Sequence, residues 1–367
     1  MSKAAELAAL IGSGEAQENK NLVVNGAMTV DQRNQTTTAT GYSVDRFTVV
    51  KANFDELVIA ITQDTDNPSG NGFAHSLKLA VTTAENAIAA DELLYLDTRF
   101  EGQNIQHLCY GTSSAKSLTL SFWVKSPLAG KHSVNFYQVT PNRSNLQSYT
   151  VSSANTWEYK TITIDGDASG NIANDTTAEI ILFWPLAGGS NSHGTPHTGW
   201  GPYSQTDDFM FSDQVNLAGQ TGNFFLTGIQ LEIGEVATAF EHEDFGTTLR
   251  KCQRYYVKDG ATYPAGTSAY KFFAAGTCVS ATSGRFTYHF PVPMRTSPTL
   301  GQSANNTISI FSAAVNPAMS ADMLINSPNQ LSTGLTTTVG SGQTTGHGAN
   351  IIANNSTAAF LEFKAEL

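Results

Sequence analysis

Hydrophobic and polar residues alternate with a period of two over many short segments of this chain. In residues 118–125, LTLSFWVK, every second position is apolar, and residues 76–81 and 225–233 repeat the pattern. Successive side chains of a β-strand point to opposite faces, so each segment predicts a strand with one buried face. Turn-forming residues separate the segments. The pattern therefore predicts an all-β protein of the sandwich or jelly-roll type.

The pattern changes about two thirds of the way along the chain, which indicates a domain junction. Residues 247–256, TTLRKCQRYY, predict a short connecting helix with Thr247 or Thr248 as its N-cap. Apolar residues recur among the Gly, Ser, Thr and Asn that follow, which favours a second, smaller β-sandwich over a low-complexity linker. The predicted parts are an N-terminal anchoring helix with its linker, a jelly-roll domain, the connecting helix and a C-terminal β-rich domain, at residues 1–20, 21–245, 246–256 and 257–367.

The N-terminal residues 3–11, KAAELAALI, favour a helix with Leu7, Leu10 and Ile11 on one face. A helix of this length is marginal alone, so its apolar face must pack against its own domain or against a neighbouring subunit. The polar stretch 14–20 resembles a linker, which favours the neighbouring subunit. Leu7, Leu10 and Ile11 are therefore the predicted anchor to another protein.

Charge excludes several classes of partner. Charged residues make up 14% of the chain and the net charge is −11. Nucleic acids and anionic membranes are bound through basic surfaces, so neither is expected. The sequence contains no apolar run long enough for a transmembrane helix and no evident secretion signal. Between residues 296 and 361 the only charged residue is Asp322, which suits a surface buried between identical subunits.

Cofactors and catalytic groups are not indicated by the sequence. Three cysteines at wide spacing match neither a disulfide framework nor a zinc module, which favours buried free thiols. A structural calcium ion would be compatible with oxygen ligands from Asp165, Asp167, Asp207 and Asp208. The GxSxG nucleophile elbow does not occur, and scattered carboxylates do not define a glycosidase pair. We therefore expect no resident cofactor and no enzymatic activity.

Aromatic side chains on polar segments are the best candidates for recognition chemistry, because exposed rings stack on the apolar faces of sugars. Trp123 falls on the polar face of its predicted strand, and residues 185–209 form a long Gly/Ser/His segment of the kind that often carries function. The predicted glycan contacts are Trp123, Trp200, Tyr203, His197 and Asp207. In an alternative, structural interpretation, this segment covers Trp123, and Trp200 closes the edge of the core.

Several stretches, taken in order, resemble a known family. They are NLVVNG at 21–26, QR at 32–33, SVDRF at 43–47, FLTGIQLEIG at 225–234, ATAFE at 237–241, CQRYY at 252–256 and HFPVPMR at 289–295. This series is similar to phage tail-fibre and tail proteins, and the N-terminal helix resembles that of such proteins in marine podovirus-like phages. The resemblance spans about residues 1–300.

The resemblance implies an N-terminal jelly roll like that of carbohydrate-binding modules, a β-rich tip, a homotrimer and a place in the virion. It implies no catalytic set. The expected function is that of a tail fibre or fibre-like adhesin that contributes to attachment to a host cell-surface glycan. Its other partners would be virion proteins of the tail or head, after assembly in the host cytoplasm. The alternatives are a capsid-decorating fibre or tail adaptor protein, and a polysaccharide depolymerase.

The same stretches also have local structural interpretations. Asp45-Arg46 would form an ion pair or a turn contact where a strand begins. Alternation in residues 225–234 would bury Ile229 and Leu231 while Gln230 and Glu232 face solvent. Phe240 would fill the core where the chain leaves the first domain.

Deletion of residues 1–12 is expected to leave a folded oligomer that no longer joins the virion, because the deletion removes the anchor and leaves the β-domains intact. Size-exclusion chromatography with light scattering measures the oligomer, and immunoblots of purified particles measure incorporation. Normal incorporation of the truncated protein would contradict the anchor assignment.

Overall fold

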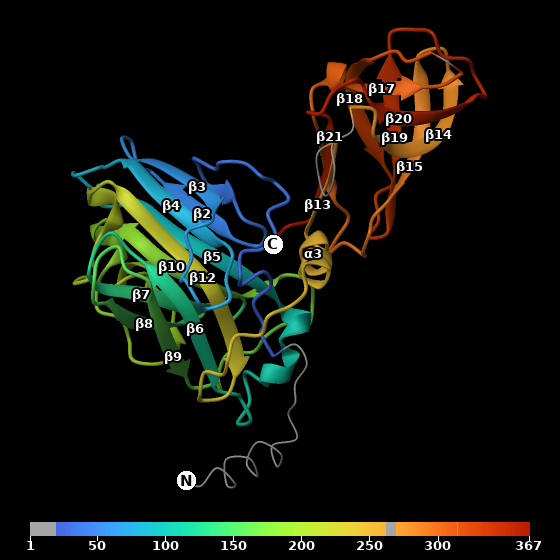
Figure 1. Ribbon diagram of the computed structural model, residues 1–367. Coiled ribbons are helices and arrows are strands. Elements are labelled where there is room, and N and C mark those ends of the chain that lie inside the picture. The colour runs from blue at the N-terminus through green and yellow to red at the C-terminus, as the bar shows by residue number, and fades with distance from the viewer. Residues whose placement is uncertain (1–19, 262–268, 314) are drawn as a thin grey trace.

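The computed structural model describes residues 20–261, 269–313 and 315–367, and the predicted anchor residues Leu7, Leu10 and Ile11 lie outside these ranges. The described chain forms two β-rich domains joined by a helix (Figure 1). The helices among these residues are few and short. The predicted all-β fold, a jelly-roll sandwich followed by a smaller β-sandwich, is confirmed.

The larger domain consists of two antiparallel sheets. The seven-stranded sheet has the order β1-β2-β5-β10-β7-β8-β11, and the five-stranded sheet has the order β3-β4-β12-β6-β9. The strands of the first sheet are β1 (Gly41–Tyr42), β2 (Thr48–Ala52), β5 (Leu93–Glu101), β7 (Gly130–Gln138), β8 (Arg143–Val151), β10 (Ala178–Gly188) and β11 (Gly201–Pro202). Those of the second are β3 (Val58–Asp64), β4 (Ser76–Thr83), β6 (Leu118–Lys125), β9 (Glu158–Ile164) and β12 (Gly222–Ile233). Short helical turns in the connections are η1 (Gly102–Asn104), η2 (Gln106–Leu108), η3 (Ser190–Ser192), α2 (Gln205–Asp208) and η4 (Leu217–Gly219).

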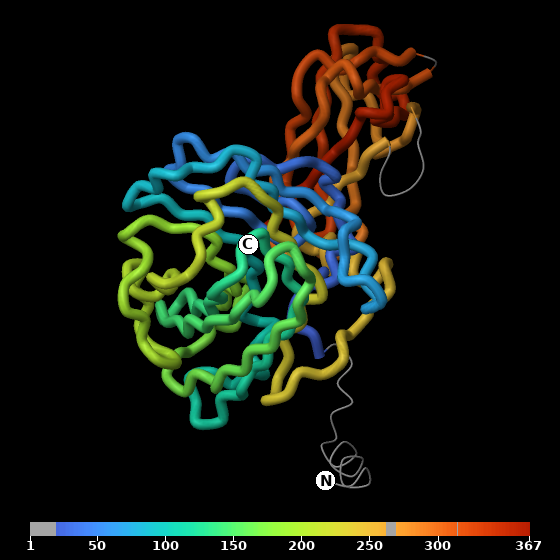
Figure 2. The backbone as a smooth tube through the Cα atoms, turned by 60° about the vertical axis from the view of Figure 1, so that its left-hand side comes forward, coloured from blue at the N-terminus to red at the C-terminus, as the bar shows by residue number. Residues whose placement is uncertain are grey.

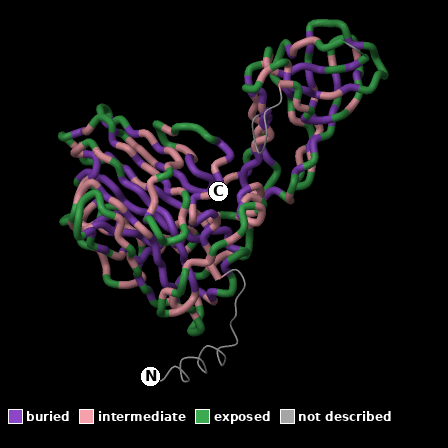
Figure 3. Tube along the Cα trace, viewed as in Figure 1, coloured by how far each residue is buried: buried purple, intermediate pink, exposed green. Residues whose placement is uncertain are grey.

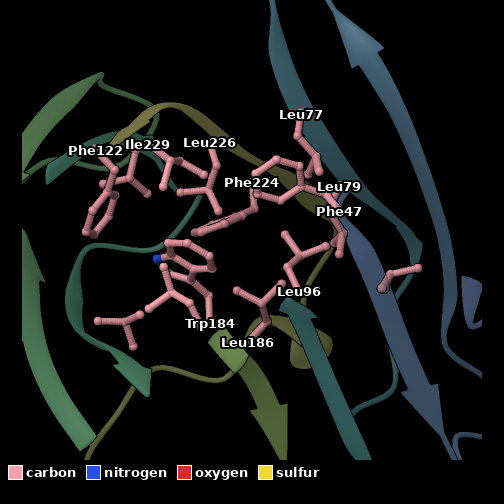
Figure 4. Close-up of a cluster of buried hydrophobic side chains, with 14 of the residues drawn as sticks. Phe47, Leu77, Leu79, Leu96, Phe122, Trp184, Leu186, Phe224, Leu226 and Ile229 are labelled. Carbon is pink, nitrogen blue, oxygen red and sulfur yellow. The ribbon is translucent and has the colours of Figure 1, made fainter. Parts of the chain in front are cut away.

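One hydrophobic core fills the space between the two sheets. Trp184 of β10 lies within a cluster of side chains from both sheets (Figure 4), and its ring meets that of Phe122 edge to face at 5.8 Å between centroids. Leu118, Leu120, Phe122 and Val124 of β6 are all buried, as the alternation predicted. Burial of each large apolar side chain stabilises the fold by about 1.5–3 kcal/mol.

Strand β12 departs from strict alternation at a β-bulge. Its register with β6 shifts around Gly228, which adopts φ +61°, a conformation that glycine takes without strain. A Cβ atom at this position would lie 2.6 Å from the ring of Phe73. The bulge keeps both Leu226 and Ile229 in the core and leaves room for Phe73 on the outer face.

Gln230 and Glu232 of β12 are buried, contrary to the prediction that they face solvent. The chain folds back over them after the strand ends. The side-chain oxygen of Gln230 accepts the backbone N–H of Glu241 at 2.8 Å, and the carboxylate of Glu232 accepts the backbone N–H of Thr238 at 2.9 Å. Alternation alone does not reveal that a later segment covers the outer face of a strand.

The smaller domain has its own core between a six-stranded and a three-stranded sheet, ordered β17-β20-β14-β15-β19-β18 and β13-β21-β16. The strands are β13 (Tyr256–Gly260), β14 (Phe272–Ser280), β15 (Ser283–His289), β16 (Thr299–Gln302), β17 (Ile308–Phe311), β18 (Met319–Asn326), β19 (Ser332–Val339), β20 (Gly348–Ala353) and β21 (Phe360–Lys364), with η5 (Asn305–Thr307) before β17. Buried residues lie in the interior of both domains, and many exposed residues lie on the connecting loops (Figure 3).

Helix α3 (Phe245–Gln253) connects the domains. Its N-cap is Asp244, whose carboxylate accepts the backbone N–H of Thr247 at 3.0 Å. The prediction that Thr247 or Thr248 is the cap is therefore wrong, because the helix begins earlier and both threonines lie in its first turn. The negative charge of the Asp244 cap also interacts favourably with the positive end of the helix dipole.

Buried arginine side chains join the two domains. The guanidinium groups of Arg33 and Arg46, from the larger domain, pair with the carboxylate of Glu366 at 2.6 and 3.0 Å, respectively. Arg33 lies 3.7 Å from the ring centre of Tyr256, and Arg46 lies 3.5 Å from that of Tyr255. Each cation therefore has an anion and an aromatic face in place of water.

Asp45 does not pair with its neighbour Arg46, contrary to one of the two sequence interpretations. The Asp45 carboxylate instead accepts the backbone and side-chain N–H groups of Gln32 at 3.0 and 2.5 Å, and it lies 3.5 Å from Arg33. Burial raises the pKa of Asp45 to about 7, against the lowering influence of Arg33 and Gln32. Arg46 adopts φ +74°, so the pair forms a turn and its two side chains serve different contacts.

Further bonds fix the relative position of the domains. Arg254 forms a bidentate pair with Glu101, with both N–O distances at 2.7 Å. Arg295 donates to the backbone oxygens of Thr176 at 2.9 Å and Ala365 at 2.7 Å. The end of the smaller domain accordingly returns to the larger domain in both views (Figures 1 and 2). The two domains therefore form one structural unit.

Glu366→Gln is expected to lower the free energy of unfolding by about 3 kcal/mol, because loss of one partner leaves the buried guanidinium groups uncompensated. Urea denaturation measures this change. Asp322→Asn is the matched control, since Asp322 is an exposed carboxylate of the smaller domain, and we expect it to change stability by less than about 0.5 kcal/mol. Equal stabilities of the two variants would contradict the role assigned to Glu366.

His132 of β7 is expected to make stability depend on pH. Its buried ring stacks on Tyr149 at 5.4 Å between centroids, and burial lowers its pKa from 6.5 to about 4. As the pH falls below 6.5, this histidine becomes protonated in the unfolded chain. In the folded protein it stays neutral until about pH 4. The contribution of His132 to stability is therefore lost across this window, by about 3 kcal/mol in total. The raised pKa of Asp45 acts in the opposite direction over the same range, so the effect of His132 is seen as a difference between variants.

Urea unfolding at pH 7 and pH 4.5 tests the role of His132. Relative to the unmodified protein, His132→Gln should gain about 2–3 kcal/mol of stability between pH 7 and pH 4.5, whereas the same change at His107, which is exposed, should leave the pH dependence unchanged. An unchanged pH profile in the His132 variant would assign the pH dependence to other groups.

Candidate functional site

A hollow of about 440 Å³ lies on the outer face of the seven-stranded sheet. Its lining residues are Leu93, Tyr95, Tyr137, Ile181, Phe183, Tyr203, Gln205 and Phe209. The strands present these side chains by simple alternation, since Leu94 and Leu96 enter the core while Tyr95 between them points outward. The segment after β10 supplies Tyr203, Gln205 and Phe209, so the predicted long loop forms part of the wall.

Aromatic rings form two groups around the hollow. Tyr95 meets Phe183 at 5.4 Å and Phe209 at 5.6 Å between centroids, and Phe183 stacks on Phe209 at 5.7 Å. Tyr137 and Tyr203 meet at 4.7 Å. Phe209 is buried, which fastens the loop to the sheet. The rings therefore form a preorganised apolar surface whose tyrosines also carry polar groups.

Most polar side-chain groups that line the hollow have no hydrogen-bond partner among the described residues. The hydroxyl of Tyr137 donates to Asn142 Oδ1 at 3.1 Å. Within the part of the chain that the structure describes, the hydroxyls of Tyr95 and Tyr203 and the amide of Gln205 have no hydrogen-bond partner. Burial raises the pKa of both Tyr95 and Tyr203. These hydroxyls therefore stay protonated at neutral pH and are available to donate to a ligand.

His197 and Asp207 hold the loop rather than line the hollow. His197 Nδ1 lies 2.7 Å from Asp208 Oδ1, and Nε2 lies 2.9 Å from the backbone oxygen of Ser144. Asp207 accepts the backbone N–H of Thr195 at 3.3 Å. These two predicted glycan contacts therefore stabilise the loop that forms one wall of the hollow and do not line the hollow themselves.

The two predicted tryptophans lie apart from the hollow. Trp200 packs against the core, donates from Nε1 to the backbone oxygen of Asp165 at 2.7 Å, and meets Tyr110 edge to face at 5.7 Å. This position agrees with the interpretation that Trp200 closes the core edge. Trp123 lies on the outer face of the other sheet, in an open groove, and the loop does not cover it. Of the five predicted contacts, only Tyr203 lines the hollow.

Sequence analysis missed Tyr95, Tyr137 and Phe183. A signal was present, because each is an aromatic residue at an outward position of an alternating strand. The same signal occurs on strands whose outer faces are covered, so alternation alone could not select these three. The three side chains come together because β5, β10 and β7 are adjacent in the sheet. This order of strands cannot be read from alternation.

Residues 20–261, 269–313 and 315–367 contain no group of three or more His, Cys, Asp or Glu side chains placed to hold a metal ion. Two of the predicted calcium ligands are engaged otherwise. Asp167 pairs with Arg143 at 2.6 Å, and Asp208 contacts His197. None of the helices described is both long enough and apolar enough to cross a membrane.

Comparison with known proteins finds similar solved structures but assigns the chain to no family. No protein-family model and no curated protein match the sequence. Similar solved structures include the enzymatically active domain of tailspike protein 4 of bacteriophage CBA120, at 12% identity and a TM-score of 0.32 over 58% of this chain. This chain covers only 21% of the length of that tailspike chain.

Carbohydrate-binding modules are also among the similar structures. The family 11 module of the Clostridium thermocellum cellulase Lic26A-Cel5E has 14% identity and a TM-score of 0.29, over 57% of this chain and 98% of the module. TmCBM61, solved with β-1,4-galactotriose, has 10% identity and a TM-score of 0.28, over 58% and 99%. These matches identify no residue of the hollow, and membership of the phage tail-fibre family stays a prediction.

Proposed function

We propose that this protein is a non-catalytic structural component of a bacteriophage virion, of the fibre or adhesin kind, that binds a host cell-surface glycan through the larger domain. The observation that carries the binding proposal is the aromatic hollow on the seven-stranded sheet. It combines ring faces with hydroxyl and amide groups that have no partner among the described residues. The virion assignment is supported by the sequence resemblance, by the order of its motifs and by the low charge.

The chemistry of the hollow matches a neutral saccharide. Sugar rings have apolar C–H faces that stack on aromatic rings, and their hydroxyls bond to groups such as those of Tyr95, Tyr203 and Gln205. The described lining contains no charged side chain.

The same lining supports binding without cleavage. Hydrolysis of a glycosidic bond generally needs two carboxyl groups on either side of that bond. Among the described residues that line the hollow there is no Asp or Glu. The depolymerase alternative therefore has no support from this site, and incubation of the protein with host polysaccharide should release no reducing ends.

Motifs behind the phage resemblance fall largely at the domain junction. The pairs 32–33, 45–46 and 255–256, together with Arg295, supply its principal bonds. A fixed junction suits a protein that must present a binding surface at a set distance from the particle. Immunogold labelling of intact virions tests this role, and the position of the label separates a tail fibre or adaptor from a head fibre.

Tyr137→Ala is expected to weaken glycan binding at least about tenfold, since it removes one ring of the hollow. Isothermal titration calorimetry with host polysaccharide, β-1,4-galactotriose and xylohexaose measures the affinity. Tyr270→Ala removes an exposed tyrosine of the smaller domain and is the matched control, which should bind as the unmodified protein does. Absence of binding to every glycan, or identical affinities of the two variants, would refute the proposal.

A further inference from the structure

We infer that the larger domain carries a second saccharide-binding site, an aromatic groove on the outer face of the five-stranded sheet. The groove has a volume of about 930 Å³. The residues that carry the argument are Trp123, Tyr159, Phe73, Phe240, His242 and Asn71. It lies on the side of the sandwich opposite the hollow, because Phe122 and Val124 point into the core on either side of Trp123. The inference adds a site to the proposed function and does not reuse the first one.

The floor of the groove is a pair of aromatic rings, of which Trp123 is half-buried and Tyr159 exposed. Trp123 of β6 and Tyr159 of β9 are direct cross-strand neighbours. Their ring centroids lie 5.4 Å apart with an angle of 48° between the planes, and Tyr159 is 45% exposed. Two adjacent rings inclined in this way offer a bent surface on which consecutive sugar units of a chain could stack.

The wall of the groove is a cluster of three rings from two distant segments. Phe73 precedes β4, whereas Phe240 and His242 follow β12. Phe73 meets Phe240 at 4.9 Å and His242 at 5.3 Å, and Phe240 meets His242 at 4.9 Å. The bulge at Gly228 makes room for Phe73, as described above. Phe240 therefore lies in a surface wall and does not fill the core, contrary to the sequence interpretation.

A separate depression of about 570 Å³ adjoins the groove on the same side of the sandwich. Phe73, Phe240 and His242 line both the depression and the groove. The three rings thus form a ridge between two concave regions. A ligand that follows both regions would have to be elongated. This arrangement favours an oligosaccharide chain over a single sugar.

Polar groups in the groove select for a hydroxyl-rich ligand. Among the described residues, Trp123 Nε1, the Tyr159 hydroxyl and the His242 ring have no hydrogen-bond partner. Donors and acceptors therefore alternate with ring faces, and the lining contains no Asp, Glu, Lys or Arg. A second copy of this chain is the alternative occupant, and a mass measurement distinguishes it from a saccharide.

Tryptophan fluorescence separates the two sites. The groove contains Trp123, whereas the described lining of the hollow contains tyrosine and phenylalanine but no tryptophan. The full-length protein is titrated with xylohexaose, β-1,4-galactotriose, mixed-linked β-1,3-1,4-glucan and bacterial O-antigen polysaccharide. With at least one of these probes we expect a change in emission that persists in Tyr137→Ala and disappears in Trp123→Phe.

Affinities provide the second measurement. For the affinity reported by tryptophan emission, Trp123→Phe removes the signal, Tyr159→Ala should weaken binding at least tenfold, and Tyr137→Ala should leave it unchanged. In calorimetry, which reports both sites, Trp123→Ala and Tyr159→Ala should remove one class of site and Tyr137→Ala the other. Val58→Ala is the matched control, since Val58 is an exposed residue of the same sheet outside the groove. Circular dichroism melting checks that each variant is folded. If Trp123→Ala is unfolded, the conservative variant Trp123→Phe takes its place in the affinity measurement.

Each outcome decides between the two sites. Loss of binding only in Tyr137→Ala overturns the second site and leaves the proposed function intact. If Tyr137→Ala changes no probe's binding in either measurement while Trp123→Ala and Tyr159→Ala do, the second site is supported and the first is removed. If Trp123→Ala changes the mass measured by light scattering and no probe's affinity, the groove is an interface between copies and the inference is wrong. Absence of binding by every probe also overturns it.

Discussion

The shared carboxylate of Glu366 is the contact on which the arrangement of this protein depends. Two arginines from the larger domain, Arg33 and Arg46, give up water to reach it, and each would be costly to bury alone. The rings of Tyr255 and Tyr256 cover the guanidinium groups at the point where α3 passes into β13. Charge, aromatic packing and chain connection therefore coincide at one place, which turns two sandwiches into a single body.

Much of the fold follows from the period of the apolar residues, and much of the junction does not. Alternation identified the buried face of β6 because each strand has a core on one side only. It failed at Gln230 and Glu232, whose outer face a later segment covers. The adjacency of Asp45 and Arg46 suggested an ion pair as one of two possibilities. Sequence proximity cannot reveal that the partner of Arg46 is Glu366, after the last strand.

The aromatic sites illustrate the same boundary between sequence and structure. Trp123 and Tyr203 could be selected because each is an aromatic residue in a polar setting. Their separation onto opposite faces could not be predicted, because it depends on which sheet receives each strand. The hollow rests mainly on sheet residues, and the floor of the groove consists of the sheet residues Trp123 and Tyr159. The alternate neighbours of these strand residues are fixed in the core. Rings held in this way lose little conformational freedom when a ligand binds, which favours affinity without movement of the backbone.

The bond between Arg33 and Glu366 spans 333 residues of sequence. During synthesis the strands of the larger domain emerge long before this carboxylate does, so that domain assembles around arginines that are still hydrated. Contacts of such long separation form late, after local and intradomain pairing. A chain halted before residue 366 would keep the bonds of Arg254 to Glu101 and of Arg295 to Thr176. It would lack the carboxylate that neutralises Arg33 and Arg46, so the charges of the junction would be balanced only when the last residues of the chain arrive.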